Sequence, residues 1–222
     1  MASINGISIK GMKNFLGHEG EPLCQGNVYL NNKKLGFWSQ DSWGGPDRFI
    51  LDPKYSKALL DQAVIARNPD KAYHGTSGDR TYVIEYNLEQ LLGDCVELAE
   101  EEQSYKKAVK AGYAAILLAT DGVHQTTWSL PHSYAQLSDE TLLEKLGPAI
   151  EKAKEGFWQE SDVVKHAVKI YRSPDDFVIG DPIDLQEILV KKNLDSTLIR
   201  AKNTADAQLS HSRETSTEKD RS

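Results

Sequence analysis

The chain has 222 residues, of which 39% are hydrophobic and 27% are charged. This composition is typical of a globular protein, and no apolar run approaches the roughly 18 residues that a membrane-spanning helix needs. The net charge is −7, and the lysines are scattered among acidic residues rather than gathered in one basic segment. We therefore expect contact with neither nucleic acid nor membrane.

The two cysteines, Cys24 and Cys95, are too few and too far apart for a disulfide framework or a cysteine-based zinc site. The first residues lack the apolar segment of a secretory signal peptide. The expected location is the cytoplasm, where thiols stay reduced. No metal site and no cofactor are expected.

Residues 1–50 are predicted to form a β-rich N-terminal subdomain. Apolar and polar residues alternate over 27–31, an Asn-rich turn follows, and a second strand pattern covers 35–38. Two strands joined by such a turn predict an antiparallel hairpin. The next segment, 39–47, contains Gly44, Gly45 and Pro46, which interrupt a strand and indicate a loop.

The spacing of apolar residues becomes helical after Asp52, which is a candidate N-cap with Pro53 in the first turn. Residues 74–80 are polar and glycine-containing, and they predict a loop before a short strand at 82–86.

The strongest helical pattern covers 88–110, where one face is apolar and Gly112 follows the last turn. Residues 113–130 predict a hairpin around Asp121-Gly122. Ser138 is a candidate N-cap of a further helix, which Gly147-Pro148 is expected to break or kink. A strand is expected over 164–171.

Asp184 is predicted to cap a last helix that ends near Arg200. Residues 51–200 thus form an α+β domain, either separate from the first subdomain or continuous with it. Seven of the last 22 residues are Ser or Thr, and Leu209 is the only large hydrophobic residue there. Because so little apolar surface cannot offset the entropy of ordering a chain, 201–222 are expected to be a disordered tail. The predicted fold class is α+β.

The most unusual segment is the loop that two tryptophans flank. Trp38, Asp41, Trp43, Gly44 and Gly45 are our candidate binding residues, since tryptophans near loops are common anchors of interfaces. The alternative is that one or both tryptophans cover the core. Three consecutive acids, Glu100, Glu101 and Glu102, are a second candidate, as an acidic patch on the surface.

Two other sets of residues carry groups that could bind a metal or act as a general base, but each set also has a simpler structural explanation. His18, Glu19, Asp41 and Asp47 carry metal-binding groups, but their spacing matches no known site and fits loop residues. Asp121 and His124 could be a general base and the residue that orients it, whereas Asp-Gly between two strands is ordinary for a hairpin turn.

Tyr73-His74-Gly75-Thr76-Ser77 resembles the His-Gly-Thr signature of ADP-ribosyltransferases. The resemblance implies an NAD-binding enzyme in which His74 contacts the ribose on the nicotinamide side and the backbone of Gly75 holds the nicotinamide amide. The family also requires a Tyr motif and a late catalytic Glu, which this sequence does not place. A surface turn is the alternative explanation.

A second resemblance covers most of the chain up to about residue 190. It is carried by the following segments: 9–13, 17–20, 26–36, 38–47, 105–113 and 171–180. They are similar to small uncharacterised proteins of phages and mobile elements, some of which, the anti-CRISPR proteins, block host defence nucleases. The resemblance implies a non-enzymatic accessory protein that binds and inhibits a host protein, such as a nucleic-acid-binding effector. An ADP-ribosyltransferase-like enzyme remains the alternative.

Overall fold

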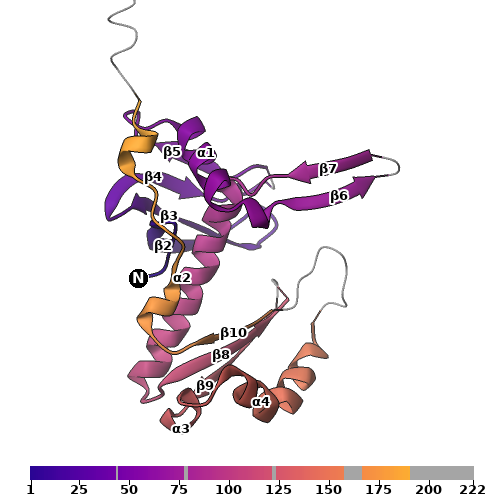
Figure 1. Cartoon of the computed structure of the whole chain (residues 1–222). Helices are drawn as coiled ribbons and strands as arrows, with labels where there is room; N and C mark the ends of the chain where they lie inside the picture. The colour runs from indigo at the N-terminus through magenta and orange to yellow at the C-terminus, as the bar shows by residue number, and fades with distance from the viewer. Residues whose placement is uncertain (44, 78–79, 122–123, 158–166, 191–222) are drawn as a thin grey trace, which may run out of the picture.

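A long helix, α2 (Leu88–Lys110), lies against two β-sheets in the computed structural model (Figure 1). The structure describes residues 1–43, 45–77, 80–121, 124–157 and 167–190. Asn87 caps the helix, because its side chain accepts from the backbone N–H groups of Glu89 and Gln90. The helix packs on β1 and β2 of one sheet and on β8 and β9 of the other. The fold is α+β, as the sequence predicts.

The first sheet has six strands in the order β11-β1-β2-β3-β4-β5. Their bounds are Ser3–Ile4 (β1), Ile7–Leu16 (β2), Pro22–Leu30 (β3), Lys33–Ser39 (β4), Arg48–Leu51 (β5) and Val178–Ile179 (β11). The hairpin of β3 and β4 is confirmed, with Leu30 opposite Lys33. Asn31 and Asn32 take φ of 48° and 67°, the left-handed region that Asn tolerates in a tight turn.

Alternate residues of this sheet face the helices and form the larger core. In β3, Cys24, Gly26, Val28 and Leu30 are buried, while the residues that alternate with them are more exposed. The same core includes residues of α1 (Lys57–Arg67) and α2. One set of buried side chains therefore joins the segments on both sides of residue 50, and β5 itself crosses that point.

The second sheet has the order β10-β8-β9, with bounds Ala167–Tyr171, Ala115–Thr120 and Gln125–Leu130. Every residue of β8 is buried, because α2 covers one face of the sheet and α4 (Asp139–Lys154) and α3 (His132–Ala135) lie against the other. Burial on both faces explains why the apolar residues run continuously in β8 instead of alternating. The predicted hairpin over 113–130 is confirmed.

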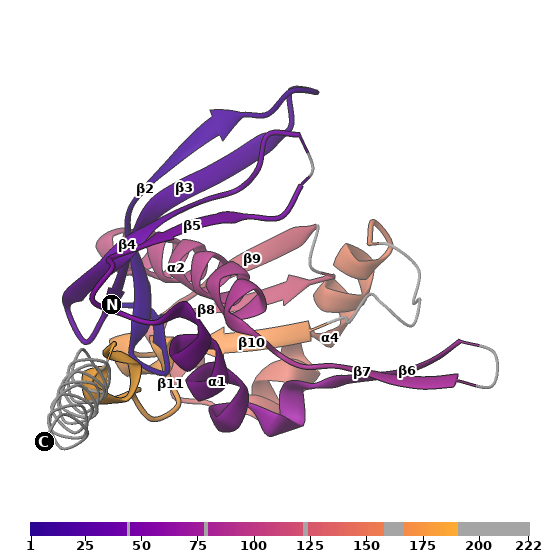
Figure 2. The same ribbon diagram turned by 90° about the horizontal axis from the view of Figure 1, so that it is seen from above.

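A third, two-stranded sheet is formed by β6 (Tyr73–Ser77) and β7 (Arg80–Ile84), which project from the body of the protein (Figures 1 and 2). The prediction of a polar loop over 74–80 is therefore wrong. Five cross-strand pairs, from Tyr73 with Ile84 to Ser77 with Arg80, form this ladder, because residues 74–76 pair with the apolar and β-branched residues of β7.

Three predicted helix boundaries also differ. Ser56, not Asp52, caps α1, because the backbone N–H of Asp52 still pairs with Leu35 at the end of the sheet. The helix α4 continues through Pro148, so Gly147-Pro148 does not break it. Asp184 is an N-cap, as predicted, but of the short 3₁₀ helix Leu185–Ile188.

Two further 3₁₀ helices, Pro69–Lys71 and Pro174–Phe177, complete the elements. The predicted helix beyond residue 190 and the predicted disordered tail, 201–222, lie outside the described residues. Within the described ranges, no helix has the length and apolar character that crossing a bilayer requires.

Candidate functional site

Two turns meet at one end of the six-stranded sheet and present an exposed tryptophan. The β2–β3 turn contains His18, whose backbone N–H donates to the carbonyl of Ser42 in the β4–β5 loop over 3.0 Å. The ring of His18 stacks on that of Trp43, with centroids 3.9 Å apart and planes 23° from parallel. Trp43 remains 74% exposed. We call residues 16–21 and 40–43 the tip.

The backbone of the tip is held by one carboxylate. Oδ2 of Asp41 accepts from the N–H of Trp43 at 3.3 Å and from that of Gly45 at 2.7 Å. A Cβ at Gly45 would lie 2.7 Å from the same oxygen, so a larger residue there would require the Asp41 carboxylate to shift. Asp41 is thus a positioning residue for Trp43. Gly44 lies outside the described residues.

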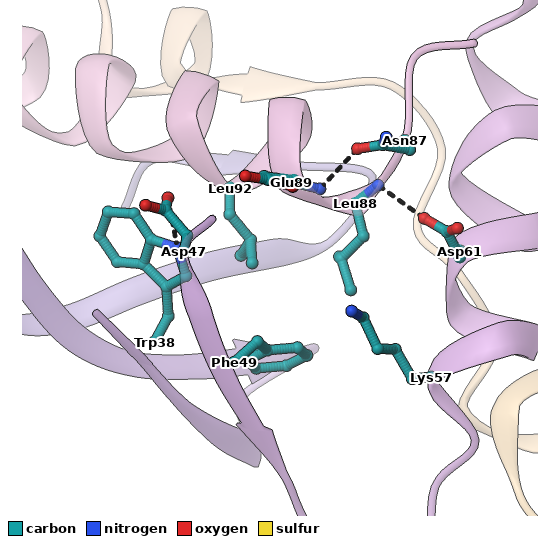
Figure 3. Close-up of a pocket in the computed structure, with 9 residues that line it drawn as sticks. All are labelled: Trp38, Asp47, Phe49, Lys57, Asp61, Asn87, Leu88, Glu89 and Leu92. Atoms are coloured by element: carbon teal, nitrogen blue, oxygen red, sulfur yellow. Dashed lines mark hydrogen bonds between the residues drawn. The ribbon is translucent and has the colours of Figure 1, made fainter. Parts of the chain in front are cut away.

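The other predicted tryptophan, Trp38, is 1% exposed, so the expectation that it contacts a partner from the loop is wrong. Its ring belongs to the core, which was the alternative for this residue. Nε1 of Trp38 donates to Oδ2 of Asp47 at 3.0 Å, as Figure 3 shows. Burial raises the pKa of the Asp47 carboxyl above its usual range, although the hydrogen bond from Trp38 opposes this shift.

Beside Trp38 a cavity of about 90 Å³ lies between the sheet, α1 and the start of α2 (Figure 3). Asp61 on its wall accepts from the N–H of Leu88 at 2.8 Å. Pockets for drug-sized ligands and cofactors measure about 300–1,000 Å³, so this cavity is too small for NAD. On the other side of Trp38 is a groove of about 330 Å³ that Asp47, Glu97 and Glu100 border.

The three consecutive glutamates do not form one surface patch. Glu100 is exposed, but Glu101 and Glu102 are 0% and 5% exposed. Successive helix residues point about 100° apart, so three neighbours face three directions. Glu101 binds Lys169 and Tyr171, and Glu102 binds Lys106 and the N-terminal amine. The predicted acidic patch is therefore wrong for two of its three residues.

The His-Gly-Thr segment lies in β6, where His74 is opposite Val83 and Gly75 is opposite Tyr82. His74 is exposed on the projecting hairpin, and neither cavity beside Trp38 includes His74 or Gly75. No observation on the described residues places a nicotinamide pocket around this segment.

The other chemically suggestive residues are separated or paired for structural reasons. His18 and Asp41 are linked through Trp43, since His18 stacks on its ring and Asp41 accepts from its backbone N–H. Within the described ranges, no group of three metal-ligating side chains occurs. The buried carboxylate of Asp121 accepts from the backbone N–H of His124 at 2.6 Å and lies 3.0 Å from its Nδ1. This contact closes the β8–β9 turn.

Sequence reasoning missed the role of His18. The two glycines in 17–20 indicate that His18 lies in a turn. Its contact with the β4–β5 loop depends on the pairing of the strands, which the sequence pattern does not give. No family model, no curated protein and no solved structure matches the chain.

Proposed function

We propose that this chain is a non-enzymatic accessory protein of a phage or mobile element that binds and inhibits a host protein through the tip. A defence nuclease is the class of partner that the resemblance suggests. The observation that supports a docking role is the exposure of Trp43 on an ordered turn. Tryptophan is the residue type most enriched among the residues that dominate binding energy.

The contacts of Trp43 favour binding because they fix its geometry beforehand. The stacked ring of His18 and the two backbone hydrogen bonds to Asp41 restrain the indole. A side chain that is already ordered loses less entropy when a partner covers it. Leu16, at the end of β2, is 73% exposed and adds apolar surface to the tip.

The charges of the tip indicate the chemistry of the partner. Glu19 and Glu21 lie in the same turn as His18, so the tip carries acidic side chains as well as the apolar Trp43 and Leu16. The complementary surface is an apolar pocket with a basic border. The nucleic-acid-binding groove of a nuclease has such a border.

The test compares three full-length proteins as bait in a lysate of the host: wild type, Trp43→Ala and Tyr113→Ala. Tyr113 is an exposed aromatic residue after α2 and serves as the matched control. We expect one stoichiometric partner with wild type and Tyr113→Ala, and its loss with Trp43→Ala. Affinity measured with the purified partner should fall by at least about 2 kcal/mol in Trp43→Ala.

Inhibition is tested on the same purified partner. If the partner is a nuclease, wild type should reduce cleavage of its substrate and Trp43→Ala should not. Unchanged affinity of the Trp43→Ala protein would exclude the tip as the docking site. Absence of any stoichiometric partner would contradict the docking role itself.

A further inference from the structure

The strands β2 to β5 carry positive charge and no negative charge. None of the four contains Asp or Glu, in a chain with 33 acidic residues. They contain Lys10, Lys13, Lys33, Lys34 and Arg48. Acidic residues near these strands lie in the turns, on α2, where Glu97 and Glu100 border the groove beside Trp38, and after β5, where Asp52 is paired with Lys54 at 2.9 Å.

Pairing of the strands places most of these cations on one face. Residues that are directly opposite in an antiparallel pair project to the same side of the sheet. One row across the sheet is Lys10, Asn27, Phe37, Ile50, and a second is Lys13, Gln25, Ser39, Arg48. Because Cys24, Val28 and Trp38 face the core, these rows lie on the opposite, outer face.

The outer face also carries two aromatic rings between its cations. Tyr29 is opposite Lys34 and lies two residues along β3 from Asn27, which is in the row that contains Phe37. Both rings are only partly buried. Nζ of Lys10 lies over the Tyr29 ring, 4.6 Å from its centroid, and donates to Oδ1 of Asn32 at 2.9 Å, so this ammonium group covers one face of the ring.

A groove of about 660 Å³ continues from this face at the edge of the sheet. Phe37 and Ile50 form part of its apolar lining. Lys33 and Lys34 lie along it, as does the ion pair of Asp52 and Lys54. The groove is large enough for a planar base, whose size is well within the range of small-molecule sites.

We propose that the outer face of β2 to β5 binds single-stranded nucleic acid. Lys10, Lys13, Lys34 and Arg48 would bind phosphates. Unpaired bases would stack on Phe37, and on Tyr29 where a base takes the place of the Lys10 ammonium group. A positively charged surface with interspersed aromatic rings is the arrangement that proteins use to bind single strands without sequence preference. A duplex does not fit this chemistry, since its bases are already stacked on one another.

An acidic protein surface is the competing ligand for a cationic face. It would use the lysines and the arginine but would gain little from rings at the centre of the face, because carboxylates do not stack on them. The position of Phe37 and Tyr29 between the cations therefore favours the nucleic acid. The proposal reverses the expectation from the scattered lysines, since strand pairing gathers residues that are distant in sequence.

The test measures fluorescence anisotropy of labelled oligonucleotides with the full chain. The probes are an oligothymidylate and an oligouridylate of about 12 nucleotides, within the usual site size of such surfaces, and a duplex of the same length. We expect the single strands to bind more tightly than the duplex. Binding should weaken with salt, with a slope of log affinity against log salt of up to about −3 for four phosphate contacts. The two single strands distinguish DNA from RNA as the ligand.

Three variants test the residues. Phe37→Leu should weaken binding about ten-fold, the cost of one lost base stack. Lys34→Gln should reduce the salt slope by about 0.7, and Lys107→Gln on α2, which makes the same charge change on another element, should not. Lys34 is exposed, so its substitution tests the proposal even if Phe37→Leu disturbs folding. Trp43→Ala should bind the oligonucleotides like wild type, which separates this face from the tip.

Three results would overturn the proposal. The first is no binding of either single strand at low salt. The second is binding of the duplex as tight as that of the single strands. The third is displacement of the oligonucleotide by polyglutamate at equal charge concentration together with an unchanged affinity of Phe37→Leu, which would assign the face to an acidic protein.

Discussion

The carboxylate of Glu101 on α2 lies 2.8 Å from Nζ of Lys169 on β10. The same carboxylate accepts a hydrogen bond from the hydroxyl of Tyr171, and Glu97 lies 2.9 Å from the same ammonium group. The Glu101 side chain is 1% exposed, whereas that of Lys169 is 34% exposed. This cluster joins the central helix to the second sheet.

We expect Glu101→Gln to lower the free energy of unfolding by about 1–3 kcal/mol, because Lys169 and Tyr171 lose a charged acceptor at a buried position. Its neighbour provides the control. Glu100→Gln changes the same chemical group at an exposed position and should shift the free energy by less than about 0.5 kcal/mol. Urea denaturation of both variants measures the difference, and equal effects would contradict the structural role of Glu101.

The same cluster predicts loss of stability at alkaline pH. Burial and the bond to Glu101 raise the pKa of Tyr171 above its ordinary 10.0. Burial alone would lower the pKa of Lys169, but its hydrogen bonds to Glu101 and Glu97 raise it above 10.5. A raised pKa means that the folded state holds the proton more tightly than the unfolded state. This stabilisation is complete below the ordinary values and is lost as the pH rises above them.

Tyr171→Phe tests this linkage. The variant should be less stable than wild type at pH 7, by about 1–2 kcal/mol, since Glu101 loses a donor. Its stability should then fall less steeply than that of wild type above the ordinary pKa of the phenol. Tyr113→Phe, at an exposed tyrosine, should follow the wild-type curve. If Tyr171→Phe also follows it in urea titrations across the alkaline range, the phenol does not contribute to the loss.

Sequence patterns predicted the helices and hairpins that are determined by residues close together in the chain. The hairpin of β3 and β4, the helix α2 and the hairpin of β8 and β9 all have a clear period, a turn or a cap in the sequence. The strand β7 carries a strand pattern in Tyr82, Val83 and Ile84, but its partner β6 was missed because Gly75 and the polar residues around it favour a loop.

The candidate sites were less predictable, because they depend on which segments meet. Trp38 and Trp43 are five residues apart and equally apolar, but one belongs to a strand that faces the core and the other to a turn. The ring of His18, which orders Trp43, comes from a different hairpin. The cations of the outer sheet face come from different strands, and the register of strand pairing brings them together. A pattern in one segment of the sequence does not reveal that register.

The two tryptophans should differ sharply in their effect on stability. Trp38→Phe leaves the half-buried carboxylate of Asp47 without its indole donor and removes buried volume, and it should cost about 2–4 kcal/mol. Trp43→Ala removes an exposed side chain and one stacking contact, and it should cost less than about 1 kcal/mol. Thermal denaturation of both variants measures the contrast. A large loss in Trp43→Ala would mean that the tip supports the fold, and its binding test would then need His18→Ala instead.

Two glycines should respond to alanine with opposite signs. A Cβ at Gly36 on β4 would lie 2.1 Å from the carbonyl oxygen of Ile50, which is backbone of the paired strand β5 and is held by the ladder. The two strands would have to separate, so Gly36→Ala should cost about 3 kcal/mol. At Gly93, inside α2, nothing lies within 4 Å of a new Cβ. Gly93→Ala should therefore stabilise the protein by about 0.5–1 kcal/mol, because alanine loses less backbone entropy in a helix.

Urea denaturation of Gly36→Ala and Gly93→Ala measures both signs in one experiment. Gly36 also lies along the groove at the edge of the sheet, so the strand separation that its substitution requires would move Phe37 and Ile50. A stable Gly36→Ala protein would show that β5 can leave β4 at little cost. In that case the outer face would not be a rigid surface at its edge, and single strands should bind it with less dependence on Phe37.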